Sequence, residues 1–326
     1  MKKIFITGGA GYVGSVLTPF LLSRGYQVTV FDLMLYGSDF FKKDKNLKVI
    51  KGDIRDENLL KKSISGHDSI IHLACISNDP SFELNPKLGE SINFKAFEPL
   101  VKISRNESVK RFIYASSSSV YGIKKEKDVD ELKTLEPLTD YSKFKAECEK
   151  ILLSYNSNNF TTTIIRPATV CGYGPRQRLD VVVNILTNLA YHNRKILVYG
   201  GEQLRPNIHI EDMARVYEVL LRADKELVSG EIFNAGYENQ KVIAIAEIVK
   251  KVIGEDVVIE IEKSNDNRSY HISSKKIKNI LNFSTEKTIE DAVIDLKNAF
   301  DKGLLKNTLN DKKYFNIKTM NALNLK

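Results

Sequence analysis

The sequence predicts an α/β fold, a doubly wound parallel sheet with a smaller mixed α/β lobe on the C-terminal side. Two observations carry this prediction. In the first half of the chain, short apolar, β-prone runs alternate with segments of helical pattern. The first of these units, residues 3–14 (KIFITGGAGYVG), joins a strand directly to a glycine-rich turn and a helix. Repeated β-α units imply parallel strands with helices on both faces of the sheet.

The elements of the first half follow from these patterns in order. The expected strands are residues 4–6, 27–32, 47–51, 69–73, 111–115 and 161–166. The expected helices between them are residues 13–24, 57–63, 86–105 and 139–154. Pro99 is expected to bend or break the third of these helices.

The second half is more mixed, and we expect it to form most of a second lobe. Its expected helices are residues 180–192, 211–222, 243–253, 274–281 and 288–300, and its expected strands are 196–199, 231–235 and 257–261. The segment after Lys302 is rich in lysine and asparagine, and we expect it to pack loosely. We therefore divide the chain into a dinucleotide-binding domain, 1–166, and a mainly substrate-binding lobe, 167–326, interleaved with it. This lobe would cap the carboxyl ends of the strands, where ligands bind in such folds.

Composition places the chain among ordinary globular proteins. Its 326 residues suffice for one large domain or two fused lobes. It has no apolar run of the roughly 18 residues that a membrane-spanning helix needs, and no signal-peptide pattern, so we expect a cytoplasmic protein without a membrane partner. Three scattered cysteines favour free thiols, and no metal site is expected. The net charge of +8 comes mostly from scattered lysines, which does not indicate nucleic-acid binding but is compatible with an anionic small substrate.

The glycine-rich turn predicts a dinucleotide site. Gly8, Gly11 and Gly14 are spaced G-x-x-G-x-x-G, and Gly9, Gly11 and Gly14 also fit G-x-G-x-x-G. Glycine permits a turn with positive φ and lets a pyrophosphate approach the backbone, while the N-terminus of the following helix stabilises its negative charge. Asp32 ends the next apolar run, where a carboxylate accepts hydrogen bonds from the adenosine ribose and repels a 2′-phosphate. The sequence therefore favours NAD over NADP.

Tyr141 and Lys145 form the candidate catalytic pair. They are four residues apart and so lie on one face of the expected helix. A tyrosine has a pKa of about 10, and lowering it to about 7 needs roughly 4 kcal/mol in favour of the phenolate. One cation about 6 Å away supplies about 3 kcal/mol at an effective dielectric constant of about 20. Lys145 together with an oxidised nicotinamide ring would suffice, although this spacing alone is more typical of a solvated helix face.

The stretch before this pair, residues 112–122 (FIYASSSSVYG), supports the catalytic interpretation. A buried strand runs into a row of hydroxyl side chains and then a turn. A hydroxyl at the carboxyl end of a parallel strand can hydrogen-bond a substrate alcohol or alkoxide.

Taken together, these motifs resemble those of the extended short-chain dehydrogenase/reductases, specifically the nucleotide-sugar epimerase/dehydratase group that includes UDP-glucose 4-epimerases. The resemblance covers nearly the whole chain. Its marks are Thr7–Gly14, Asp32, Gly52–Ile54, His72–Ala74, Asn93, Ser116–Gly122, Tyr141–Lys145, Arg166-Pro167, Gly172–Pro175 and Arg205–Asp212. It implies a Rossmann-type first domain, bound NAD, and oxidoreductase chemistry on a nucleotide-diphosphate sugar.

The resemblance also implies roles for single residues. Tyr141 is implied as the catalytic acid or base, Lys145 as its partner, and Ser117 as the catalytic hydroxyl. The implied cofactor contacts are Gly8, Gly11, Tyr12, Val13, Gly14, Asp32, Asp53, Ile54, Leu73, Ala74, Asn93, Tyr141, Lys145 and Pro167. The implied substrate contacts are Ser117, Ser118, Thr169, Arg205 and Arg268, although the acid that usually follows the last of these arginines is absent. Relatives usually dimerise through the helix of the Tyr/Lys pair and the long helix before it, so a homodimer is expected. Such enzymes often supply activated sugars for bacterial surface polysaccharides.

Departures from the family pattern narrow the reaction and leave alternatives. Sugar 4,6-dehydratases of this family carry an acid just after the catalytic hydroxyl, whereas Ser118 and Ser119 stand here, so dehydration is disfavoured. The leading hypothesis is oxidation of the C4 hydroxyl, as in 4-epimerases. Thr169 replaces an asparagine of many C4 epimerases, which keeps a net 4-dehydrogenase or 4-keto reductase as the alternative. A non-catalytic NAD-binding scaffold is disfavoured because the Tyr/Lys pair is present.

Overall fold

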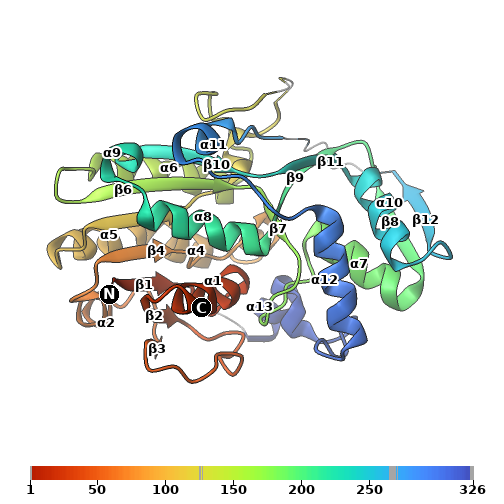
Figure 1. Ribbon diagram of the computed structural model, residues 1–326, viewed down its shortest axis with the longest axis horizontal. Coiled ribbons are helices and arrows are strands. Elements are labelled where there is room, and N and C mark those ends of the chain that lie inside the picture. The colour runs from red at the N-terminus through yellow and green to blue at the C-terminus, as the bar shows by residue number, and fades with distance from the viewer. Residues whose placement is uncertain (1, 125, 127, 264–268, 270, 324–326) are drawn as a thin grey trace.

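In the computed structural model, which describes residues 2–124, 126, 128–263, 269 and 271–323, a seven-stranded parallel sheet forms the centre of the larger lobe (Figure 1). The strand order is β10-β6-β5-β4-β1-β2-β3. The strands are β1 (Lys3–Thr7), β2 (Gln27–Asp32), β3 (Leu47–Lys51), β4 (Ser69–His72), β5 (Arg111–Ala115), β6 (Thr161–Pro167) and β10 (Glu231–Ala235). The predicted doubly wound fold is confirmed. The strand order reverses between β1 and β4, and ligands of such folds bind in the crevice beyond the carboxyl ends at that point.

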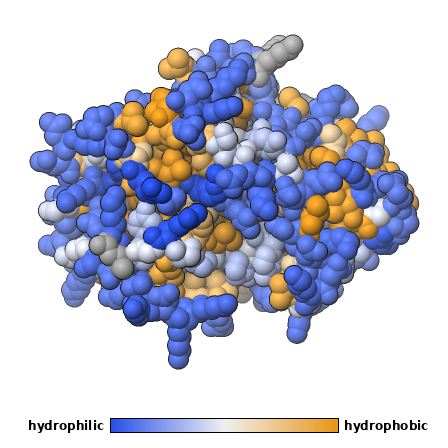
Figure 2. Space-filling view, viewed as in Figure 1, coloured by the Kyte–Doolittle hydropathy of each residue, from blue (hydrophilic) through white to orange (hydrophobic). Residues whose placement is uncertain are grey.

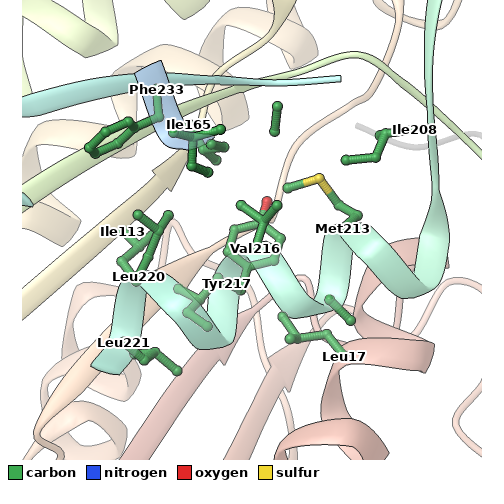
Figure 3. Packing of buried hydrophobic residues seen from close by; sticks show 14 of the residues in the cluster. Leu17, Ile113, Ile165, Ile208, Met213, Val216, Tyr217, Leu220, Leu221 and Phe233 are labelled. Carbon is green, nitrogen blue, oxygen red and sulfur yellow. The ribbon is translucent and has the colours of Figure 1, made fainter. Parts of the chain in front are cut away.

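Helices cover both faces of this sheet. On one face, α1 (Tyr12–Ser23) packs against α8 (Ile210–Arg222). Figure 3 shows apolar side chains of α8 meeting those of α1 and of the sheet; the labelled ones are Leu17, Ile113, Ile165, Ile208, Met213, Val216, Tyr217, Leu220, Leu221 and Phe233. The opposite face is covered by α2 (Glu57–Ile64), α5 (Phe97–Asn106) and α6 (Asp140–Ser154), which enclose a second apolar core. Because both faces are covered, the central strands are apolar throughout rather than alternating.

The helix expected over residues 86–105 is divided into three parts. They are α4 (Pro86–Glu90), the π-helical turn η1 (Ser91–Lys95) and α5. Pro99 lies in the first turn of α5, where its ring is incompatible with a regular hydrogen bond to the carbonyl of Lys95. The break therefore falls just before the proline rather than at it. A short helix, α3 (Asp79–Glu83), precedes α4 and was not predicted.

The smaller lobe contains two small sheets and three longer helices. β7 (Thr169–Cys171), β9 (Leu204–His209) and β11 (Glu238–Lys241) form one sheet, and β8 (Lys195–Tyr199) pairs with β12 (Val258–Glu262) in the other. α7 (Val182–Asn193), α10 (Val242–Ile253) and α12 (Ile289–Asp301) enclose a third apolar core. Figure 2 shows apolar residues gathered on the surface of this lobe, and Val258 and Ile261 of β12 are among the exposed apolar residues of the chain. The sequence analysis missed all three strands of the first of these sheets. β7 is only three residues long, β9 reads LRPNIH with a proline inside it, and β11 reads ENQK and lacks an apolar face.

The chain passes between the two lobes more than once. β10 lies beyond residue 167 in sequence, yet it pairs with β6 at the edge of the main sheet. α8, α9 (Lys225–Val228) and α11 (Lys275–Leu281) also accompany this sheet. The division at residues 166 and 167, with the interleaving expected between the two parts, stays a prediction.

The expectation that the segment after Lys302 packs loosely is wrong. Leu305, Thr308 and Tyr314 are buried, and Leu305 and Tyr314 pack against Phe300 of α12. The short helix η3 (Lys312–Tyr314) then leads into α13 (Asn316–Leu323). Composition misled the prediction because a few inward-facing side chains suffice to dock a polar segment. Like the other helices in the described ranges, α13 is not long and apolar enough to cross a membrane.

Candidate active site

A cavity of about 550 Å³ opens at the carboxyl ends of the central strands. Its wall includes the turn after β1, the ends of β2, β4 and β5, and the start of α6. Residues of the smaller lobe complete the wall. Small-molecule sites typically have volumes of about 300–1,000 Å³. The cavity therefore lies where the strand order predicts a ligand, and it has a suitable size.

The glycine-rich turn is shaped by close backbone contacts. Gly8 has a φ of +72°, and a Cβ atom there would lie 2.5 Å from the backbone nitrogen of Ala74. A Cβ on Gly14 would lie 2.3 Å from the carbonyl oxygen of Gly9. α1 begins directly after Gly11, with no side-chain cap and no acidic residue in its first turn. Its first N–H groups are therefore available for an anion, as a pyrophosphate site requires.

We expect Gly8→Ala to weaken NAD binding by at least about tenfold, because the turn must shift to relieve overpacking that typically costs about 1–3 kcal/mol. Gly25→Ala is the matched control, because Gly25 also has a positive φ of +84° but nothing lies within 4 Å of a Cβ there. NAD titration and thermal unfolding of both variants measure the effect. Equal NAD affinity in the two variants would show that the contact with Ala74 does not shape the site.

Asp32 lines the cavity at the end of β2 and is held by backbone groups. Its Oδ2 accepts a hydrogen bond from the N–H of Ala10 at 3.0 Å, and its Oδ1 accepts one from Met34 at 2.8 Å. Burial raises the pKa of Asp32, while these two hydrogen bonds and the charge of Arg176 oppose that rise. The carboxylate is thus fixed where the sequence analysis expects the adenosine ribose.

The residues expected around the cofactor divide into lining and supporting positions. Val13, Asp53, Ile54, Leu73 and Ala74 line the cavity, as does Pro167 across it. Tyr12 also lines it, but its hydroxyl is bonded to the carbonyl of Gly172 at 2.5 Å and so ties the two lobes together.

Asn93, which the resemblance implies as a cofactor contact, does not line the cavity. It is buried outside the cavity lining, and its amide exchanges two hydrogen bonds with the backbone of Ile76, at 2.8 and 2.9 Å. Asn93 therefore supports the wall of the cavity from behind, through the backbone of Ile76.

The Tyr/Lys pair faces the cavity from the first turns of α6. Thr139 caps this helix in a reciprocal box with Ser142, which fixes where the helix starts. Tyr141 is 9% exposed and Lys145 is 5% exposed. The Lys145 ammonium donates to the carbonyl of Ala115 at 2.6 Å and lies 5.8 Å from the centre of the Tyr141 ring. The solvated-face alternative for this spacing is therefore wrong.

In the chain by itself, burial raises the pKa of Tyr141 well above its usual value. The charges of Cys75 and Asp79 act in the same direction, while Arg178 and a hydrogen bond with Ser117 oppose them. Ionisation of this phenol at neutral pH therefore requires additional positive charge. That Lys145 and an oxidised nicotinamide ring supply this charge stays a prediction.

The serine row after β5 lies beside this pair. Ser117 caps η2 (Ser118–Tyr121), and its Oγ lies 2.8 Å from the Oγ of Ser119. Ser117, Ser118 and Ser119 all line the cavity. Ser116 instead donates a hydrogen bond to the buried Glu149 of α6. One strand end thus supplies hydroxyls to the cavity and also anchors the helix that carries Tyr141.

Two of the expected substrate-binding residues lie in the smaller lobe. Thr169 at the start of β7 and Arg205 on β9 line the cavity. Arg268 lies outside the described residues. The structure thus brings Ser117, Ser118, Thr169 and Arg205 to the same cavity.

Several lining residues were missed by the sequence analysis. Arg176 and Arg178 follow the Gly172–Pro175 turn, and both line the cavity. The Nε of Arg178 pairs with Asp180 at 2.5 Å. Asp79 also lines the cavity and accepts a hydrogen bond from Thr139. The two arginines could have been found, because they directly follow the Gly172–Pro175 motif that the sequence analysis singled out. No sequence motif pointed to Asp79.

Comparisons with known proteins identify the family of this chain. Residues 4–236 match the profile of the "NAD dependent epimerase/dehydratase family". The chain is 30% identical over 275 residues to a dTDP-D-glucose 4,6-dehydratase of Dictyostelium discoideum, covering 78% of this chain but only 62% of that protein. It is 31% identical over 263 residues to a UDP-N-acetyl-alpha-D-glucosaminuronate decarboxylase of Bacillus cytotoxicus, covering 77% of this chain and 79% of that protein.

The fold is shared with solved structures. A UDP-glucose 4-epimerase of Thermotoga maritima, solved with UDP-glucose, superposes with a TM-score of 0.83 at 24% identity. The match covers 93% of this chain and 100% of the other. These three similar proteins are named for three different reactions, 4,6-dehydration, decarboxylation and 4-epimerisation, so similarity alone does not select the reaction of this chain.

Proposed function

Because this chain belongs to the NAD-dependent epimerase/dehydratase family, we propose that it is an NAD-dependent enzyme that oxidises the C4 hydroxyl of a nucleotide-diphosphate sugar. The observation that carries this proposal is the position of Tyr141. Its ring lies beside Lys145, and it shares one cavity with Ser117, the glycine-rich turn and Asp32.

In this proposal each group at the cavity has a separate role in oxidising the sugar or in binding the ligands. Tyr141 takes the proton of the C4 hydroxyl, and Ser117 hydrogen-bonds the same oxygen and orients it. Lys145 stabilises the phenolate by its positive charge. NAD, when bound, supplies the acceptor for the hydride that leaves C4. Gly8, Gly11, Gly14 and Asp32 would hold the cofactor, and Arg205 suits a diphosphate because its guanidinium matches phosphate oxygens.

The fate of the oxidised sugar distinguishes the candidate reactions. A 4-epimerase returns the hydride to the other face of C4, whereas a net dehydrogenase releases the keto sugar, and a 4-keto reductase runs the reverse step. A 4,6-dehydratase is disfavoured, because Ser118 and Ser119 stand where an acid is needed, and Ser118 is almost fully buried. We propose the epimerase-type reaction, with net oxidation or reduction at C4 as the alternative.

Mass analysis of the products tests this proposal directly. The purified protein is incubated with a panel of nucleotide hexoses. A new isomer of unchanged mass supports epimerisation, loss of two hydrogens supports oxidation, and loss of water supports dehydration. No product from any sugar, together with binding of NAD, would instead favour the non-catalytic scaffold.

A homodimer and a role in making activated sugars for surface polysaccharides are the remaining parts of the proposal. The expected interface includes the outer face of α6, where Lys143 and Glu147 are exposed in the single chain. Sedimentation analysis of the purified chain measures its mass in solution, and a monomer at micromolar concentration would contradict the dimer.

A further inference from the structure

The segment 312–323, comprising η3 and α13, forms part of the cavity wall. Asn316 and Met320 both line the cavity, although they are some 300 residues away from the glycine-rich turn in sequence. α13 packs against α3. The segment is attached to the smaller lobe at its start, because the N–H of Leu179 donates to the carbonyl of Tyr314 at 2.9 Å. A segment expected to be loose is therefore docked across the opening between the lobes.

Asn316 joins three loops of the chain to α13. Its Oδ1 accepts hydrogen bonds from the hydroxyl of Tyr36 at 2.9 Å and from Nη2 of Arg176 at 2.7 Å. Its Nδ2 donates to Ser77 at 3.0 Å, and its backbone N–H donates to Asp180 at 2.8 Å. These partners follow β2, β4 and β7, so one buried amide connects the loops at the mouth of the cavity to α13.

Arg176 is held by this amide with part of its guanidinium left for a ligand. It is 5% exposed, and its Cζ lies 3.5 Å from the centre of the Tyr36 ring. Its Nε has no hydrogen-bond partner within the described part of the chain. Burial of the charged group lowers its pKa. Because a buried donor without a partner is costly, an anionic group in the cavity would satisfy it.

Met320 places the same segment at the adenine end of the cavity. It packs in the apolar core that contains Ile54, Leu88 and Ile92, and all four residues line the cavity. Ile54 is the residue that the sequence analysis assigned to the adenine. α13 therefore contacts both the apolar end of the site, through Met320, and its cationic wall, through Asn316.

We propose that the segment 312–323 is a retaining wall of the dinucleotide site, and that Asn316 holds it closed so that NAD remains bound between turnovers. The inference rests on the proposed function, because it takes NAD as the occupant. A cofactor that does not exchange has to return its hydride to the sugar. The wall therefore favours reactions that are redox-neutral overall, such as epimerisation, over net oxidation.

The release rate of NAD tests this inference. The holoenzyme is loaded with labelled NAD and mixed with an excess of unlabelled NAD, and loss of label is followed with time. Asn316→Ala removes three side-chain hydrogen bonds, so we expect release to become at least about tenfold faster. Asn321→Ala is the matched control, because Asn321 is exposed on the same helix. It should release NAD as the unaltered protein does.

A second variant separates the wall from the groups that line the cavity. Thr319 is buried outside the lining, and its hydroxyl donates to the carbonyl of Lys312 at 2.6 Å, so Thr319→Val loosens the segment alone. We expect faster release in this variant also, with a melting temperature in the absence of NAD close to that of the control. Release at the control rate in both variants would overturn the inference and leave the proposed function intact. An unaltered protein that binds no NAD would overturn both.

Discussion

Tyr141→Phe is expected to lower kcat by about 10²- to 10⁴-fold while NAD still binds, because the change removes only the oxygen that accepts the substrate proton. The ring itself is buried, and phenylalanine has nearly the same shape, so the fold should be retained. Product formation by mass detection measures the activity, and NAD titration confirms that the site is intact. Activity close to that of the unaltered protein would refute the assigned role.

The pH dependence of the same step provides an independent test. Burial raises the pKa of Tyr141, and the phenolate is the form that accepts the proton. We therefore expect kcat to rise with pH as the phenolate fraction increases, and to level off above the pKa reached in the complex. Removing the nearby charge with Lys145→Met should move the rise to higher pH. An unshifted profile in that variant would mean that Lys145 does not act through the phenol.

Glu149→Ala is expected to lower the free energy of unfolding by about 3–5 kcal/mol, because it leaves the Arg166 charge buried and uncompensated. Oε2 of Glu149 lies 2.6 Å from Nη2 of Arg166, and both side chains are 3% exposed. Burial lowers the pKa of Arg166, but the hydrogen bonds and charge of Glu149 outweigh this and raise it. Denaturant unfolding measures the loss.

Two further variants distinguish this ion pair from surface charges. Glu147 lies on the same helix and pairs with Lys150, but the two side chains are 50% and 69% exposed. Glu147→Ala should therefore change stability by less than about 1 kcal/mol. Replacing Glu149 and Arg166 together by methionine should restore much of the loss, because no unpaired charge remains. A large effect at Glu147, or none at Glu149, would contradict this account of how α6 is fixed to the sheet.

Much of the fold could be predicted because its signals are local. Each strand of the main sheet is a short apolar run, and each neighbouring helix has its own apolar face. β1 to β6, α1, α2 and α6 to α8 were therefore found within a few residues. The helix expected over residues 86–105 is the exception, because it is interrupted by the π-helical turn η1. Pro99 is a local cause of the interruption, but η1 also packs against α6, which the sequence does not show. β11 was missed because a polar strand shows no pattern until β9 lies beside it.

The site was predictable only where chemistry and backbone geometry are fixed by neighbouring residues. Gly8 and Asp32 belong to this group, since a turn and a strand end place them. Asn93 shows the limit, because the sequence identifies the residue but not whether its amide faces a ligand or the backbone of Ile76. Arg176 was missed because its importance depends on being buried beside Tyr36, which is distant in sequence.

The sequence by itself determined that a parallel sheet presents a glycine-rich turn, a strand-end carboxylate, a serine row and a Tyr/Lys helix. These features arise within single β-α units, where periodicity and turn chemistry act over a few residues. Only the tertiary structure decided that the Tyr141 and Lys145 face of α6 is buried at the cavity rather than solvated, and that Asn316 joins the cavity walls. Such contacts depend on segments far apart in sequence packing together, and no local pattern encodes that packing.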